Sequence, residues 1–266
     1  MGKSRKLCVF VSLTALLFSC SSDEEDAIQF ATVKSDKTVQ LSNDVNSPSC
    51  NVHLELAYAT DDNGHKAEII NNAIESRLLD IENLPMQQAA DSFASVYATN
   101  YKKNFLPLYN QDRGDESKRS WYEYHYIIKS EAGKGHKAST AYNIYLDYYE
   151  GGAHGIIQHL TMNFENKTGR TLSLADIFVP GYEHQLNVLL LNALQEKTGC
   201  RNITELHDKG YLYSMDMFPS ENFILSDDTI TFIYNPYEIA PYAAGTTELT
   251  IAYSSLDNIL KNSFAR

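Results

Sequence analysis

Residues 121–129 read WYEYHYIIK, and this stretch indicates the fold class. Its apolar and aromatic residues alternate with polar ones, so an extended chain has one apolar face and one polar face. The same period of two recurs over 144–148 and 156–164, on either side of a short glycine-rich connection. Strands joined by tight turns pair antiparallel. We therefore expect an antiparallel meander in the middle of the chain.

Helical periodicity flanks this meander on both sides. Before it, apolar residues recur at helical spacing over 67–81 and again from 86 to 101. After it, a helix is expected over 186–194, preceded by the capping-box spacing of residues 173–176. The remaining expected elements are strands at 52–59, 230–234 and 249–253 and a short helix at 255–261. The pattern predicts an α+β fold, a mainly antiparallel sheet with helices packed on one side, with two intimately packed subdomains as one possible arrangement.

The N-terminus has the layout of a lipoprotein signal peptide. Three basic residues precede an uncharged run over 7–19, which is too short to cross roughly 30 Å of hydrocarbon as a helix. The residues before Cys20, Leu-Phe-Ser, resemble a lipobox, in which the thiol accepts diacylglycerol. We expect residues 1–19 to be removed and Cys20 to be a lipid anchor in the outer membrane. An ordinary secretory signal with a chance cysteine is the alternative.

Residues 20–48 are polar and are expected to form a lipidated acidic tether and linker. The acidic run over 23–26 resembles the surface-export signal of some Gram-negative lipoproteins, which favours an outward-facing location. The alternative is a solvated tether that like-charge repulsion keeps extended, with either side of the membrane open.

The charge balance limits the class of partner. Loss of residues 1–19 lowers Lys+Arg from 22 to 19 while Asp+Glu stays at 34, so the formal charge moves from -12 to -15. Such a surface repels nucleic acids and anionic lipid headgroups, and contact with the membrane is expected through the lipid anchor only. Cationic partners are favoured.

Two cysteines, Cys50 and Cys200, remain in the exported part after Cys20. In an oxidising compartment we expect a disulfide between them; two separate buried thiols are the alternative. No C-x-x-C spacing occurs, so a cysteine zinc site is not expected, and we assign no other metal site and no cofactor.

Three stretches contain residues that are unusual for plain core building: 148–155 (YYEGGAHG), 168–178 (TGRTLSLADIF) and 234–245 (YNPYEIAPYAAG). Together they resemble the extracytoplasmic domain of unknown role found in the lysozyme-sensing anti-sigma-V factor and before the catalytic domain of a peptidoglycan deacetylase. The resemblance covers about residues 140–264. It implies a C-terminal α+β domain at 138–266, after a companion N-terminal α+β subdomain at 49–137. It also implies a binding module of the cell envelope.

Two of these stretches supply candidate binding residues. Two glycines in the first suit a turn with positive φ, and two prolines force the third to leave its sheet as a loop. An aromatic and carboxylate cluster of this kind can hold a sugar or a basic side chain, although a plain hairpin and a loop covering the core remain the alternatives. The candidates are Tyr149, Glu150, His154, Tyr237, Glu238 and Tyr242.

The chain contains none of the common catalytic motifs, so we assign no catalytic residue. Our leading hypothesis is a non-catalytic binding module of the envelope for a cationic protein, such as a lysozyme, or for a peptidoglycan-type glycan. The alternative is a hydrolase or deacetylase of envelope polysaccharide, with Glu150 and Glu238 or Asp147 as paired carboxylates and His154 in the site.

Overall fold

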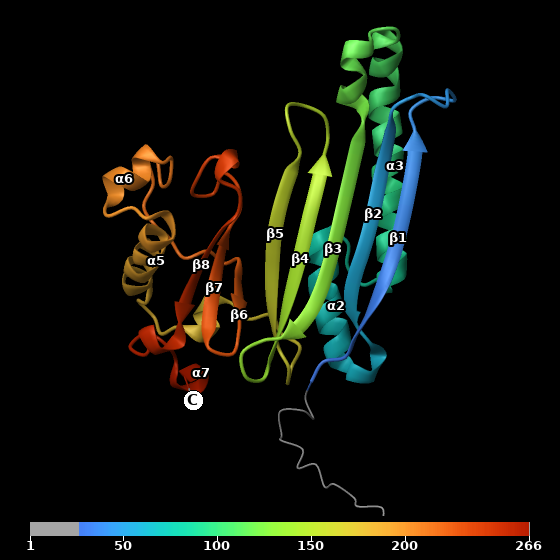
Figure 1. Cartoon of the computed structure of the whole chain (residues 1–266). Helices are drawn as coiled ribbons and strands as arrows, with labels where there is room; N and C mark the ends of the chain where they lie inside the picture. Colours follow the sequence, from blue (N-terminus) through green and yellow to red (C-terminus); the bar gives the residue numbers. More distant parts are fainter. Residues whose placement is uncertain (1–26, 266) are drawn as a thin grey trace, which may run out of the picture.

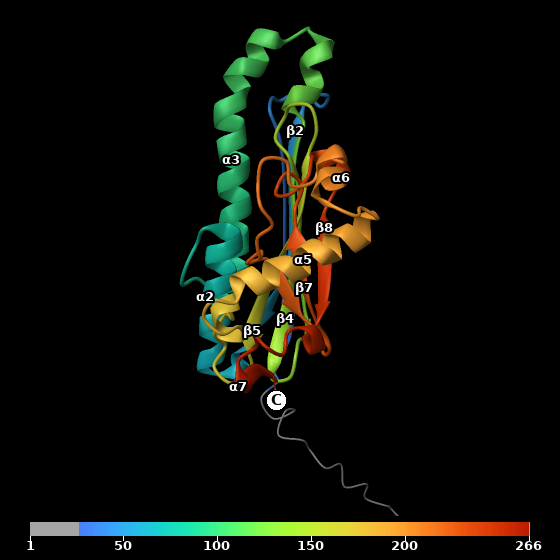
Figure 2. The ribbon, with the colours of Figure 1, turned by 90° about the vertical axis from the view of Figure 1, so that its left-hand side faces the viewer.

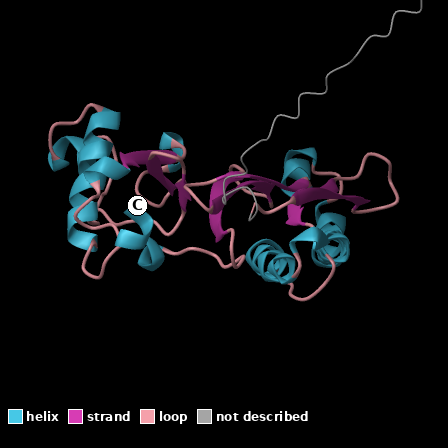
Figure 3. Cartoon of the chain, turned by 90° about the horizontal axis from the view of Figure 1, so that it is seen from below, coloured by secondary structure: helices cyan, strands magenta, loops and turns pink. Residues whose placement is uncertain are grey.

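The computed structural model describes residues 27–265 and contains two β-sheets side by side (Figures 1 and 3). The larger sheet has five strands in the order β1-β2-β3-β4-β5, antiparallel except for the parallel pair β2 and β3. Its strands are β1 (Phe30–Gln40), β2 (Ser49–Ala59), β3 (Tyr124–Lys134), β4 (Ser139–Tyr149) and β5 (Ile156–Glu165).

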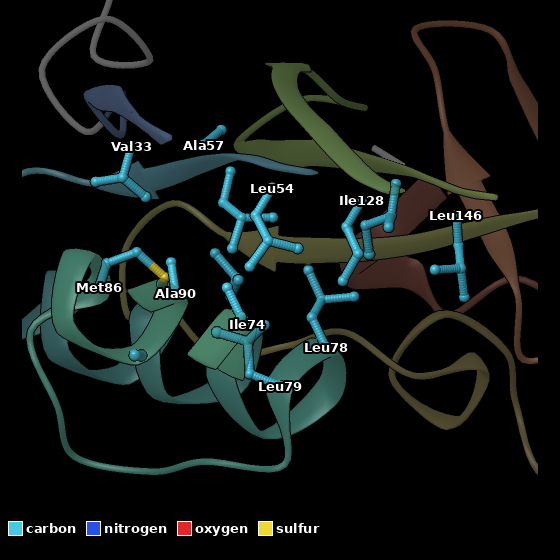
Figure 4. Packing of buried hydrophobic residues seen from close by; sticks show 14 of the residues in the cluster. Val33, Leu54, Ala57, Ile74, Leu78, Leu79, Met86, Ala90, Ile128 and Leu146 are labelled. Carbon is cyan, nitrogen blue, oxygen red and sulfur yellow. The ribbon is translucent and has the colours of Figure 1, made fainter. Parts of the chain in front are cut away.

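The parallel pair explains where the first helices lie. Parallel neighbours need a long crossover, and here it consists of α2 (His65–Leu79), α3 (Met86–Asp112) and the short 3-10 helix η2 (Glu116–Tyr122). Both long helices pack on one face of the sheet (Figure 2). Ile74 and Leu78 of α2 lie against the strand residues of the core in Figure 4. Within residues 27–265 no helix packs on the opposite face of the sheet, which carries polar side chains such as Glu55, Lys129 and Asn143.

The smaller sheet has its own core. It contains β6 (Phe223–Leu225), β7 (Thr229–Tyr234) and β8 (Thr247–Ala252), all antiparallel. Helix α5 (Glu183–Thr198) buries Leu186, Leu190 and Leu194, which are spaced by four, in the hydrophobic core of the smaller sheet. The other helices of this part are α4 (Leu174–Ile177), α6 (Ile203–Asp208) and α7 (Asn262–Ala265).

Asparagine side chains join the two sheets. Along the edge of β5, the backbone N–H groups of His159 and Thr161 donate to the amide oxygens of Asn235 and Asn222, each at 2.8 Å. Both asparagines also donate to the carbonyl oxygen of His159. From the other side, the Asn163 side chain binds the backbone of β6. These contacts satisfy edge groups that would otherwise need another strand.

The α+β class predicted from the sequence is confirmed, and so are the meander, the two helices before it and the capping box at Ser173. Three expectations about the chain's organisation are wrong. Residues 30–40 of the expected linker form β1, and a boundary at 137/138 would separate β3 from β4 within one sheet. The end of the chain forms a 3-10 turn at 253–255 and α7 rather than a helix over 255–261.

The signal peptide, Cys20 and the acidic run over 23–26 lie outside the described residues. Among the residues that are described, no helix is long and apolar enough to span a membrane.

The expected disulfide is also wrong, because Cys50 and Cys200 are free thiols. Cys50 lies at the start of β2 in the hydrophobic core of the larger sheet. Cys200 follows α5 and lies in the separate core of the smaller sheet. The structure instead has the alternative arrangement, in which the two cysteines are separate buried thiols. Burial raises the pKa of the Cys50 thiol to about 12, with a smaller contribution from Glu150.

Candidate functional site

The loop between β4 and β5 presents one of the candidate residues, His154. Gly151 and Gly152 have φ values of 82° and 97°, which side chains rarely adopt. A Cβ on Gly151 would lie 2.9 Å from the carbonyl oxygen of Trp121, so the loop packs closely against η2 at that point. After this turn, His154 is exposed, and its Nδ1 lies 2.8 Å from the carbonyl oxygen of Gly155.

The loop between β7 and β8 presents two more candidates, Tyr237 and Tyr242. As expected from its prolines, the segment leaves the sheet after β7 and forms a loop with a short 3-10 turn. Tyr237 has a φ of 74° and is 61% exposed. A large residue in this left-handed region is strained, and such strain is concentrated at functional sites.

His154, Tyr237 and Tyr242 meet in one group, which we call the aromatic cluster. The His154 ring stacks on Tyr242, with centroids 4.0 Å apart and an interplanar angle of 23°. Tyr237 lies beside both rings, and its hydroxyl is 3.2 Å from Nε2 of His154. With the Nδ1 proton donated to Gly155, Nε2 of a neutral imidazole accepts from the Tyr237 hydroxyl. The aromatic cluster is thus a surface formed by two loops from different sheets.

The other three candidates have local roles. The Tyr149 hydroxyl donates to the carbonyl oxygen of Gly152 at 2.9 Å and so closes the β4–β5 turn. Glu150 accepts a 2.5 Å hydrogen bond from the hydroxyl of Tyr97 on α3. Burial, followed by this carboxylate, raises the pKa of Tyr97. Glu238 accepts from the backbone N–H of Asn235 at 3.0 Å within its own loop.

These contacts give the hydrolase alternative no support. Glu150 is bonded to α3, Glu238 is bonded within the β7–β8 loop, and neither lines the cavities of about 950, 750, 700 and 420 Å³ found in the described part of the chain. Within residues 27–265, no group of three or more His, Cys, Asp or Glu side chains is placed to hold a metal ion.

A neighbouring loop, residues 209–219, was not predicted from the sequence. Its Leu212 N–H donates to the carbonyl oxygen of Ile239 at 2.7 Å, which joins it to the loop of the aromatic cluster. Leu212 and Ser214 have positive φ, and Tyr213 is 77% exposed. The segment has no periodicity, so the available signal was its density of large apolar residues between two loop-forming stretches.

The comparisons with known proteins agree with this architecture. A family model described as a protein of unknown function, DUF3298, matches residues 175–254. A crystal structure of a DUF3298 member from Bacteroides fragilis NCTC 9343 is 30% identical and covers 90% of this chain and 98% of its own, with a TM-score of 0.82. The chain belongs to the DUF3298 family.

A second DUF3298 structure, from Pseudomonas aeruginosa PAO1, shares the fold at 18% identity, with coverage of 90% and 97% and a TM-score of 0.63. No curated protein matches the chain. The family-model match falls inside the stretch of about 140–264 whose motifs carried the resemblance described above.

Proposed function

We propose that this DUF3298 protein is a non-catalytic binding module of the cell envelope that recognises a cationic protein of the lysozyme kind through the aromatic cluster. The observation that carries the proposal is the exposed, strained Tyr237 packed beside the stacked rings of His154 and Tyr242. Such rings hold lysine or arginine side chains by cation–π contact, worth about 0.5–1 kcal/mol at exposed sites.

The charge of the chain supports the same class of partner. A formal charge of -15 after signal-peptide removal would attract a basic protein and speed its association, and salt would weaken the effect. The resemblance to the extracytoplasmic domain of the lysozyme-sensing anti-sigma-V factor points to the same partner.

Titration with hen egg-white lysozyme at low and physiological salt, with a parallel lysis-inhibition assay, tests the proposal. Tyr237→Ala and Tyr242→Ala should each weaken binding about fivefold, the equivalent of ~1 kcal/mol. Val188→Ala, which removes an exposed apolar side chain from α5, is the matched control and should have no effect. The absence of binding at both salt concentrations would refute lysozyme as the partner.

We also propose that the module is anchored to the outer membrane through Cys20 and faces outward. The proposal rests on the lipobox-like residues and on the acidic run over 23–26. Cys20→Ser should abolish incorporation of labelled palmitate. Protease added to intact cells should digest the protein, and replacing Asp23 to Asp26 with alanines should protect it. Unchanged digestion of that variant would remove the export-signal interpretation.

A further inference from the structure

A polar groove lies between the two sheets, on the face of the larger sheet opposite α2 and α3. Its floor comes from β1 to β5 and its wall from β6 to β8. Its volume of about 750 Å³ lies within the usual range for small-ligand sites, and sites between packed units are common. The side chains that give it chemical character are Glu55, Glu131, Asn143, Tyr145, His159 and Glu248.

The wall of this groove is held in place before any ligand arrives. Asn222 and Asn235 bind the backbone of β5 at His159 and Thr161, and both of these β5 residues line the groove. The angle between floor and wall is therefore set by directional hydrogen bonds as well as by packing. A preformed groove binds without a large ordering cost.

Carboxylates outnumber basic side chains in the polar lining. Glu131 makes no ion pair with any described residue, and Glu248 has only a 3.9 Å contact with Nδ1 of His159. Glu55 is already paired with Lys34 at 2.8 Å. Lys129 is the only lysine or arginine in the described lining, against three carboxylates. Carboxylates of this kind accept hydrogen bonds from hydroxyl groups and repel anions.

Two aromatic rings also line the groove. Tyr145 and His159 lie with their centroids 5.8 Å apart and their planes tilted by 60°. They offer an apolar ring face beside the hydrogen-bonding groups. This combination suits a ligand with many hydroxyl groups on one side and C–H groups on the other.

We infer that this groove binds an oligosaccharide without acidic groups. Sugar hydroxyls donate to the carboxylates of Glu131 and Glu248 and exchange hydrogen bonds with the Asn143 amide, while a sugar ring packs on Tyr145. Phosphorylated or uronic-acid ligands are disfavoured by the carboxylates, and purely apolar ligands by the polar lining. None of the residues that line the groove belongs to the aromatic cluster, so the inference does not rest on cationic-protein binding.

The test uses the exported chain from residue 21 onward and five tetrasaccharides, built from glucose, mannose, galactose, N-acetylglucosamine or galacturonic acid. Binding is measured by calorimetry and mapped by NMR chemical shifts. At least one of the four neutral probes should bind with a Kd below about 1 mM and shift the signals of Tyr145 and His159. The galacturonic acid probe should not bind.

Variants localise the binding. Glu131→Gln and Tyr145→Ala should each weaken the neutral probe about tenfold, whereas Glu183→Gln, an exposed acid on α5, should not. Tyr145→Phe keeps the ring and controls for misfolding of the alanine variant. The inference is overturned if no neutral probe binds, if the shifts map elsewhere, or if the acidic probe binds equally well. Tyr237→Ala should leave saccharide binding unchanged, so this test is independent of the lysozyme titration.

Discussion

Asn163, which is 1% exposed, forms hydrogen bonds between the two sheets, and we expect its substitution to destabilise the fold. Its amide nitrogen donates to the carbonyl oxygen of Phe223 at 2.8 Å, and its amide oxygen accepts from the N–H of Leu225 at 3.0 Å. Asn163→Ala leaves the N–H of Leu225 without this partner in a buried place, and it removes one of two hydrogen bonds to the carbonyl oxygen of Phe223, which still accepts from the Thr161 hydroxyl at 2.7 Å. The unpaired N–H costs about 1–3 kcal/mol and the lost second hydrogen bond about 1 kcal/mol more, so we expect a loss of about 2–4 kcal/mol in the free energy of unfolding.

Urea unfolding followed by circular dichroism measures this loss directly. In a chain of this size the loss corresponds to a fall of roughly 4–16 °C in the melting temperature. The control is Asn51→Ala on β2, where an exposed amide bonds only Thr38 and Ser49 side chains; its effect should stay within about 0.5 kcal/mol. If Asn163→Ala were no more destabilising than Asn51→Ala, the hydrogen bonds between the sheets would not stabilise the fold as we argue.

Three further predictions concern strain and burial. Tyr237→Gly, which relieves a φ of 74°, should be at least about 0.5 kcal/mol more stable than Tyr237→Ala by urea unfolding, and equal stability would argue against backbone strain at this residue. Gly151→Ala should destabilise more than Gly152→Ala, because both glycines have positive φ but only a Cβ at 151 meets a backbone atom, 2.9 Å away; melting temperatures in the reverse order would contradict this packing. Burial raises the pKa of the Glu75 carboxyl, so the folded state holds its proton more tightly and loses stability as pH rises above about 4.5. Glu75→Gln should therefore be more stable than wild type at pH 7, and the difference should vanish at lower pH; a difference independent of pH would exclude titration of Glu75 as its cause.

The elements with strong periodicity could be predicted from the sequence, and β1 could not. Only Val33 and Ser35 are buried along β1, which is an edge strand of the larger sheet. A strand with one buried apolar residue gives no alternating signal. The domain boundary failed for a related reason: β3 and β4 belong to one sheet, but the clearest motifs begin only near Tyr148.

The structure brings three of the six candidate residues together and gives the other three local roles. Residue type indicated that His154, Tyr237 and Tyr242 were unusual, but hydrogen-bond partners separated them from Glu150 and Glu238. A carboxylate that accepts from Tyr97, 53 positions away, cannot be distinguished in sequence from a carboxylate that awaits a ligand. The groove could not be predicted from the sequence either, because the residues that line it are far apart in the chain and come from both sheets.

The three unusual stretches all lie where the two sheets meet. In the first stretch, His154 stacks on Tyr242 of the third. Gly169 of the second stretch, with a φ of 75°, lies so close to α2 that a Cβ would sit 2.9 Å from the carbonyl oxygen of Lys66. Asn235 of the third stretch binds β5. Residues that look like a binding signature therefore also fix how the sheets join.

This double role has a consequence for function. Both proposed sites are composite, because the aromatic cluster needs loops from both sheets and the groove needs a floor from one and a wall from the other. A change in the angle between the sheets would alter both sites at once, without touching a ligand-binding side chain. The asparagine contacts hold that angle, so a variant such as Asn163→Ala that remains folded should weaken lysozyme and saccharide binding together. Substitutions within either site should affect one ligand only.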